Sequence, residues 1–166
     1  MNIIVTSKEL TDGQEMPQKS LCPLYKGIDL SPSLQWTQVH DAKSYALLCY
    51  DPDLPNQTVW IHWILTYIPK HRHSLPTLRP INAEHIILNN EDRLIQGVNS
   101  WGKYGWGGPC PSKNLPKIEH KYYFIIYALN TKIYNGNNYT FLKAISENCI
   151  GIGSLIGTLD LAQINN

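Results

Sequence analysis

Three separate parts of the sequence carry polar side chains that could act together on a small ligand. Asp51 and Asp53 are separated by a single proline. His62 lies in an apolar segment, and His120 precedes Tyr122 by two positions. Two imidazoles, a phenol and an orienting carboxylate suit an anion such as a phosphate or a carboxylate. The same groups could instead form a two-histidine, one-carboxylate metal site or an acid–base pair for hydrolysis.

Each of these residues also has a purely structural interpretation. A histidine in an apolar strand is more often a neutral core residue than a functional group. Asp51 and Asp53 lie at a corner that Pro52 and Pro55 stiffen, where an aspartate commonly caps backbone N–H groups in an Asx-turn. The functional interpretation therefore requires that the three parts meet in space.

The segment from Gly97 to Pro116 is rich in glycine and proline, yet it also contains Trp101, Tyr104 and Trp106. Such a segment is neither a helix nor the interior of a sheet, and large aromatic side chains favour burial. We therefore predict an ordered loop. Its glycines would let the backbone approach a ligand closely, and successive N–H groups around Gly108 could bind an anion.

Strands must position these residues. Alternation over 120–129 places His120, Tyr122 and every second residue after them on one face. Residues 44–50 are apolar at nearly every position, which predicts a strand buried on both faces that ends at Asp51. Residues 59–68 form another apolar strand, in which strict alternation places His62 and Trp63 on opposite faces.

The remaining elements favour an all-β protein with minor helices. Frequent tyrosine, tryptophan, proline and glycine are typical of this class. Short strands are expected at 3–6 and 86–88, and within 30–36 Leu34 and Trp36 are expected to point inward, as at one edge of a sheet. The spacing of apolar residues predicts one helix over 140–148, with Thr140 as its N-cap. The tail, 151–161, is expected to end as an edge strand or a packed segment.

Length and composition indicate one domain that spans residues 1–166. A formal net charge of +1, without a run of Lys or Arg, provides no field for binding nucleic acid. The sequence shows no signal peptide and no apolar run of membrane-spanning length, which predicts a cytoplasmic protein without stable membrane insertion. Its four cysteines form no Cys-x-x-Cys pair and are expected to be free thiols.

Six separated motifs occur between residues 31 and 129: Ser31-Pro32-x-Leu34-x-Trp36, Asp51-Pro52-Asp53-x-Pro55, Trp60-x-His62-Trp63, Gly97-x-Asn99-x-x-Gly102, Gly108-Pro109-Cys110-Pro111 and His120-x-Tyr122-x-Phe124. In this order they resemble the phosphatidylethanolamine-binding protein family, the Raf-kinase-inhibitor-like proteins. The length is most similar to that of the compact bacterial members.

This resemblance implies a β-sandwich in which a large central antiparallel sheet packs on a smaller sheet, with a few peripheral helices. It implies a shallow pocket for phosphate or phosphorylated head groups, and a cis peptide bond near the Asp-Pro-Asp motif, for which Leu54–Pro55 is the candidate. The positions that match the family's motifs are expected to line this pocket: Asp51, Asp53, His62, Gly108, Pro111, His120 and Tyr122.

Some positions depart from the family pattern. Trp106 stands where the family usually has tyrosine, and Ser112 stands where bacterial members tend to have a second proline. Leu159 replaces the tyrosine of the usual Gly-Thr-Tyr. The rim of the pocket is therefore expected to differ. Little chain follows Asp160, so we expect no gating helix of the animal type and a more open pocket.

The sequence thus predicts a non-enzymatic, ligand-sensing or partner-modulating protein that binds phosphate or a phosphorylated head group, without cofactor or metal. A kinase or protease partner is implied by the family alone. The alternative is a metal-assisted or acid–base hydrolase that uses His62, His120 and Asp51, or Cys110 as a thiol nucleophile. The chain has no Gly-x-Ser-x-Gly or P-loop motif. If the histidines donate to the anion, affinity should rise as the pH falls through about 6.5.

Overall fold

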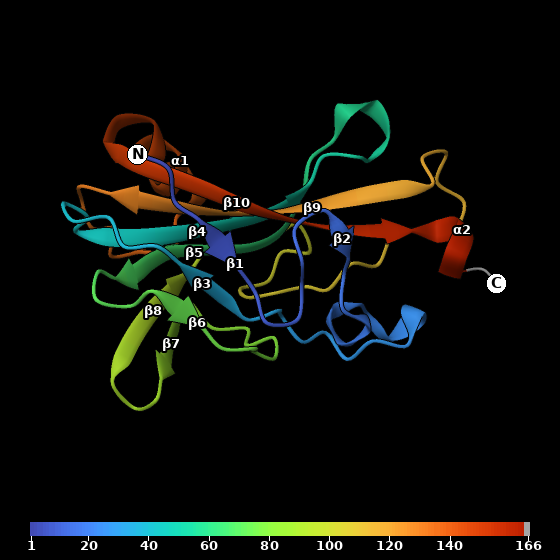
Figure 1. Ribbon diagram of the computed structural model, residues 1–166, viewed down its shortest axis with the longest axis horizontal. Coiled ribbons are helices and arrows are strands. Elements are labelled where there is room, and N and C mark those ends of the chain that lie inside the picture. Colours follow the sequence, from blue (N-terminus) through green and yellow to red (C-terminus); the bar gives the residue numbers. More distant parts are fainter. Residues whose placement is uncertain (165–166) are drawn as a thin grey trace.

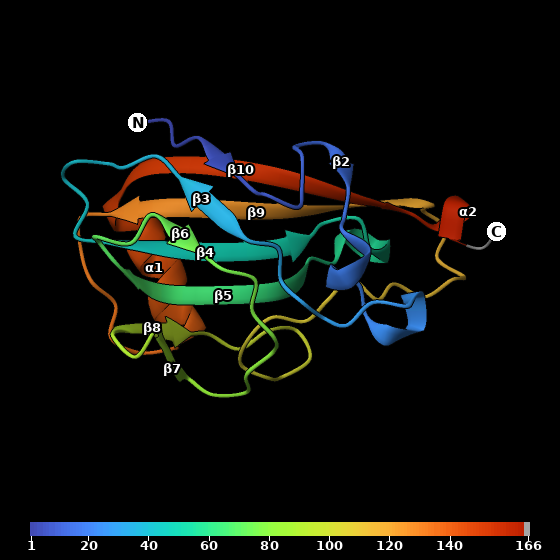
Figure 2. The ribbon, with the colours of Figure 1, turned by 60° about the horizontal axis from the view of Figure 1, so that its bottom comes forward.

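The computed structural model describes residues 1–164, which form three layers. A small β-sheet covers one face of a large sheet, and helix α1 (Asn138–Asn148) packs on the other face (Figures 1 and 2). The predicted β-sandwich with minor helices is confirmed. No helix in these residues is long and apolar enough to cross a membrane.

Neighbouring strands of the large sheet are antiparallel, except for one parallel pair, β2 with β10. In spatial order the large sheet contains β2 (Gln14–Glu15), β10 (Cys149–Asp160), β9 (Glu119–Leu129), β4 (Ser44–Asp51), β5 (Trp60–Pro69), β8 (Asp92–Gln96) and β7 (His85–Leu88). The small sheet contains β1 (Val5–Thr6), β3 (Leu34–Trp36) and β6 (Ser74–Leu75). The other described elements are the 3-10 turns η1 (Gln18–Ser20), η2 (Pro23–Tyr25) and η3 (Pro55–Gln57), and helix α2 (Leu161–Ile164).

Strand β9 contributes to two hydrophobic cores, as its alternation predicted. Tyr122 and Phe124 belong to the core beneath the small sheet, whereas Tyr127 and Leu129 belong to the core beneath α1. Strand β4 is buried on both faces in the same way, which explains its continuous apolar sequence. Because β4 and β9 are antiparallel neighbours, the end of β4 lies beside the start of β9.

A β-bulge in β5 sets the direction of His62. Residues 49 and 50 of β4 pair with residues 63 and 61 of β5, so His62 is an extra residue in the ladder. A bulge interrupts the pleat and can re-aim a side chain. His62 and Trp63 both contact the ring of Trp106. The predicted placement of these two residues on opposite faces is therefore wrong.

The C-terminal third differs from the prediction in two details. Helix α1 begins at Asn138, and its N-cap is Asn137, whose side chain accepts from the Thr140 N–H at 2.9 Å. Thr140 is therefore not the cap, because Asn137 supplies an equivalent acceptor earlier in the chain. The tail forms β10, which is not an edge strand but lies between β9 and β2.

All peptide bonds among residues 1–164 are trans, so the cis bond predicted at Leu54–Pro55 is wrong. The corner turns instead through Asn56 and Gln57, whose φ angles are 60° and 57°. These angles lie in the left-handed region, which asparagine adopts more readily than most residues. The chain can therefore reverse here while the proline stays trans.

The prediction of four free thiols is also wrong. Cys22 and Cys110 form a disulfide across 88 positions of sequence, whereas Cys49 and Cys149 are free. The disulfide joins the residue before η2 to the glycine-rich loop. Disulfides persist mainly in oxidising compartments. The cytoplasmic location stays a prediction, and this disulfide does not favour it.

We expect Cys22→Ser to lower the free energy of unfolding by about 2–4 kcal/mol, because the unfolded chain would no longer be cross-linked. Urea denaturation measures the difference. Cys149→Ser is the matched control, since Cys149 is an exposed free thiol, and its effect should stay within about 0.5 kcal/mol. Alkylation of unfolded, non-reduced protein should label Cys49 and Cys149 alone, and labelling of all four cysteines would contradict the pairing.

Candidate functional site

Asp51 and His120 form the buried centre of the site. Asp51 is the last residue of β4, His120 is the second residue of β9, and both side chains are almost inaccessible to solvent. His120 Nδ1 lies 2.7 Å from Asp51 Oδ2. Since a carboxylate oxygen accepts, Nδ1 donates and the ring orientation is fixed. Asp51 Oδ1 accepts from the Asp53 N–H at 2.7 Å, so Asp51 both forms an Asx-turn and orients an imidazole.

His62 is held by the glycine-rich loop through two hydrogen bonds. Its Nδ1 lies 2.7 Å from the Gly107 carbonyl oxygen, and the Gly107 N–H donates to the His62 carbonyl at 2.9 Å. Because a carbonyl oxygen only accepts, Nδ1 carries a hydrogen. Burial lowers the pKa of His62 to about 4, although the Gly107 bond and Asp51 oppose this shift. His62 is therefore neutral at neutral pH, and the titration predicted near pH 6.5 is wrong for this residue.

Two buried polar atoms at the site lack a partner within residues 1–164. They are the hydroxyl of Tyr122 and Nε2 of His120, both on fully buried side chains. Burial raises the pKa of Tyr122 far above its ordinary value, so the phenol keeps its proton and can donate it in a hydrogen bond. An unsatisfied buried hydroxyl costs about 1–3 kcal/mol, which a ligand that accepts from it would offset.

Tyr122 borders a cavity of about 210 Å³. This is smaller than the roughly 300–1,000 Å³ of pockets for drug-sized molecules, so the cavity suits a ligand of few heavy atoms. Its polar lining consists of Asp51, His62, Ser112 and Tyr122, and its other lining residues are Leu54, Trp60, Trp101, Cys110, Pro111 and Leu115.

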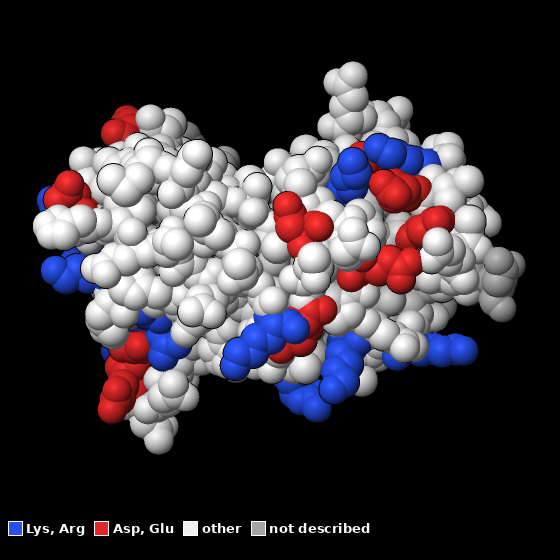
Figure 3. All heavy atoms as spheres, viewed as in Figure 1, with Lys and Arg blue, Asp and Glu red and all other residues white. Residues whose placement is uncertain are grey.

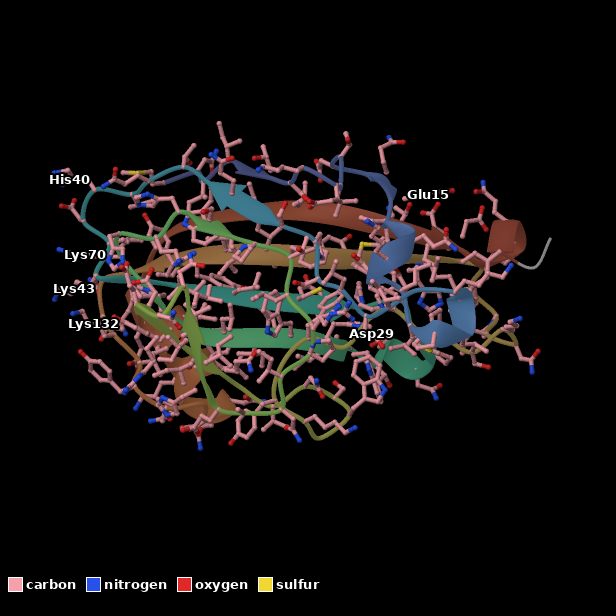
Figure 4. All side chains as sticks on the ribbon, turned by 90° about the horizontal axis from the view of Figure 1, so that it is seen from below. Glu15, Asp29, His40, Lys43, Lys70 and Lys132 are labelled. Atoms are coloured by element: carbon pink, nitrogen blue, oxygen red, sulfur yellow. A yellow bond between two sulfur atoms is a disulfide. The ribbon has the colours of Figure 1, made fainter. Side chains whose placement is uncertain are left out.

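Among the described residues, none that lines this cavity is cationic, and Asp51 is the one acidic lining residue. Lys43, Lys70 and Lys132 lie together at the opposite end of the molecule (Figure 4), where β4 begins. The cavity therefore lacks the Arg or Lys side chains that usually pair with phosphate.

Asp53 and Pro111 lie at the rim of the site. Asp53 accepts from the Lys121 N–H at 2.8 Å and forms an ion pair with Lys117. Both Asp53 oxygens are thus occupied within the protein, and Asp53 does not line the cavity. Pro111 does line it, and its carbonyl accepts a hydrogen bond from the Tyr25 hydroxyl.

Gly108 lies beside a neighbouring cavity rather than this one. Its N–H donates to Asp29 Oδ1 at 3.1 Å, and the N–H of Gly107 donates to His62. The N–H groups of Gly107 and Gly108, which were predicted to bind an anion, are thus used inside the protein. A Cβ at Gly108 would lie 2.4 Å from the Ser20 carbonyl oxygen, so close packing alone requires glycine here.

Sequence reasoning missed the aromatic wall of the cavity. Trp101 stands edge-on to His62, with ring centroids 5.2 Å apart, and it also contacts Trp60. The aromatic residues of the loop predicted that it is ordered, but their spacing did not indicate which ring faces the site. Asp29, which fixes Gly108, belongs to none of the six motifs.

Comparisons with known proteins agree with this architecture. The chain matches the model of the family "Phosphatidylethanolamine-binding protein" over residues 6–160. A UPF0098 protein of Methanothermobacter thermautotrophicus is 35% identical over 150 residues, which cover 88% of this chain and 91% of the relative. A UPF0098 protein of Archaeoglobus fulgidus is 34% identical over 149 residues, or 88% of this chain, and the match spans 47% of that relative's length.

A solved structure resembles the whole described fold. It is the phosphatidylethanolamine-binding protein homolog CT736 of Chlamydia trachomatis, with a TM-score of 0.77, 28% identity, and coverage of 96% of this chain and 97% of that chain. The chain belongs to the phosphatidylethanolamine-binding protein family. The resemblance that the six motifs indicated is thereby confirmed.

The lowered pKa of His62 predicts how stability depends on pH. Because this pKa is about 4 in the folded protein and 6.5 ordinarily, the unfolded state binds more protons between these values. The contribution of His62 should be fully present above about pH 6.5 and should decrease as the pH falls toward 4, by roughly 3 kcal/mol in total.

Urea unfolding at a series of pH values between about 4.5 and 7.5 measures this dependence. His62→Asn is the matched control, because its amide can still donate to the Gly107 carbonyl but does not titrate. The variant should lack this part of the pH dependence. Equal slopes of unfolding free energy against pH in the two proteins would contradict the assignment.

Proposed function

We propose that this protein is a non-enzymatic binding module for a small ligand that carries a phosphate or a similar anionic group. The observation that carries the proposal is the unpartnered hydroxyl of Tyr122, a fully buried residue that lines the cavity. A ligand oxygen that accepts from this hydroxyl would satisfy it. His62 and Asp51 border the same cavity and would orient the ligand.

Several features favour binding over hydrolysis. The Nδ1 atoms of His62 and His120 are engaged with Gly107 and Asp51. Cys110 is part of the disulfide, so it has no thiolate to act as a nucleophile. Within residues 1–164, no group of three or more His, Cys, Asp or Glu side chains is arranged to hold a metal ion. The hydrolase remains the alternative that the experiment below addresses.

A ligand-sensing or partner-modulating role and a kinase or protease partner remain predictions from the family. The absence of a nucleic-acid partner also remains a prediction, made from the net charge. On the face in Figure 3, Lys and Arg are interspersed with Asp and Glu and form no continuous basic patch. Nucleic-acid-binding surfaces usually show such a patch.

Calorimetric titration of phosphoethanolamine into the metal-free protein should show saturable binding. Tyr122→Phe should weaken the affinity by roughly tenfold, because a hydrogen bond from the phenol to a charged ligand contributes about 1.5 kcal/mol. Tyr134→Phe is the matched control, since Tyr134 is 67% exposed and lies outside the cavity lining; it should bind like the wild type.

A second titration in the presence of zinc separates the two functions. Binding that is unchanged by zinc supports a binding module. Binding that appears only with zinc, together with phosphate release from a phosphomonoester, would favour the hydrolase. Absence of binding under both conditions would overturn the proposal.

A further inference from the structure

The hydrogen atoms at the cavity indicate which form of a phosphate ligand it accepts, an inference that rests on the proposed function. His62 Nδ1 carries the hydrogen that goes to the Gly107 carbonyl. In the neutral ring, Nε2 is then a bare acceptor. Within residues 1–164 no hydrogen bond is formed at Nε2, and His62 lines the cavity. The side of His62 toward the cavity thus offers a lone pair instead of a hydrogen.

Asp51 adds to the acceptor character of the cavity. Its Oδ1 and Oδ2 already accept from the Asp53 N–H and from His120, and a carboxylate has no hydrogen to donate. Among the described residues that line the cavity, Tyr122 has a buried hydroxyl without a partner, and the Ser112 hydroxyl is a further donor in the lining. A ligand that matches this set must accept at Tyr122 and donate at His62.

We propose that the cavity selects the singly protonated form of a phosphomonoester, whose P–OH donates to His62 Nε2 while another phosphate oxygen accepts from Tyr122. A fully ionised phosphate has no such hydrogen and would place an oxygen lone pair against Nε2. A sulfate ester has the same shape and a single negative charge, but it also lacks the hydrogen. The cavity therefore discriminates against both.

The charges around His62 agree with this selection. Asp51 faces it from β4, and His120 and Tyr122 face it from β9. None of the loop residues that line the cavity is charged. A second negative charge on the ligand would therefore meet a carboxylate without a cationic side chain in the lining to offset it. The low pKa of His62 keeps its ring neutral over the pH range in which a phosphomonoester loses its second proton.

This selection assigns the pH dependence of binding to the ligand instead of the protein. The second pKa of a phosphomonoester is about 6. Affinity should be constant at pH values below about 6 and should fall about tenfold for each pH unit well above it, as the protonated fraction falls. The histidine-based prediction from the sequence has the same direction but a different cause.

The decisive experiment compares phosphoethanolamine with ethanolamine O-sulfate, its isostere without an acidic hydrogen, by calorimetry on the whole protein from about pH 5 to 8. At pH 5 both head groups carry one negative charge. Phosphoethanolamine should bind at least about tenfold more tightly, and its affinity should decline above pH 6. Equal or tighter binding of the sulfate ester, or affinity independent of pH, would overturn the selection while leaving the binding module intact. If neither compound binds, the proposed function itself fails, and the inference with it.

Two further measurements test the role of His62 directly. In His62→Gln the side-chain amide can rotate to present its NH2 group, so the ratio of the two affinities should approach one. Nitrogen-15 chemical shifts of the His62 ring in the wild-type protein at pH 7 should show hydrogen on Nδ1 and none on Nε2. A cationic ring, or the opposite tautomer, would overturn the inference even if the variant did not fold.

Discussion

The paired hydrogen bonds between His62 and Gly107 are the constraint on which the site depends. They join the bulge of β5 to the glycine-rich loop, and they determine which nitrogen of His62 carries hydrogen. The close approach requires glycine at position 107, because a Cβ there would lie 2.3 Å from the ring of Trp101. The backbone contact, the tautomer and the aromatic wall of the cavity are therefore parts of one arrangement.

The same loop is attached on its other side to the N-terminal segment. The disulfide Cys22–Cys110, the hydrogen bond from Tyr25 to Pro111 and the hydrogen bond from Gly108 to Asp29 all connect it to residues 22–29. A loop of this composition would have many conformations if it were free. Attachment on both sides explains how a segment rich in glycine can form a defined wall of a small cavity.

Electrostatics give this cavity a character that its residue types do not reveal. A carboxylate, two imidazoles and a phenol look like a set of donors for an anion. In the folded protein, however, the hydrogens of both Nδ1 atoms are directed at protein oxygens, one on Asp51 and one on Gly107. Burial keeps His62 neutral because a charged imidazole would lose its hydration without gaining a full counter-charge. What remains toward the cavity are the hydroxyl hydrogens of Tyr122 and Ser112 and the lone pairs of His62 and Asp51.

Much of the fold could be predicted because its signals are local. Alternation along β9, the continuous apolar run of β4 and the spacing of residues in α1 each reflect which face of an element is buried. The motif order also indicated the family, and it identified Asp51, His62, Pro111 and Tyr122, which line the cavity. His120 does not line the cavity but holds Asp51 through a hydrogen bond. The structure differs from the prediction where the local pattern is interrupted. The extra residue at His62 puts Trp63 on the same face as His62, and Asn137 replaces Thr140 as the N-cap of α1.

By itself, then, the sequence determined the long strands β4, β5 and β9, helix α1, the family and the residue types at the site, since each depends on neighbouring positions or on the order of the motifs. The tertiary structure decided the bulge, the pairing of Cys22 with Cys110, the partners of Asp53 and Gly108, and the direction of every hydrogen at the cavity. These features depend on contacts between residues that are far apart in the chain, such as Gly107 with His62. Composition and periodicity carry no information about which distant backbone carbonyl an imidazole will meet, and here that single contact determines whether His62 donates or accepts.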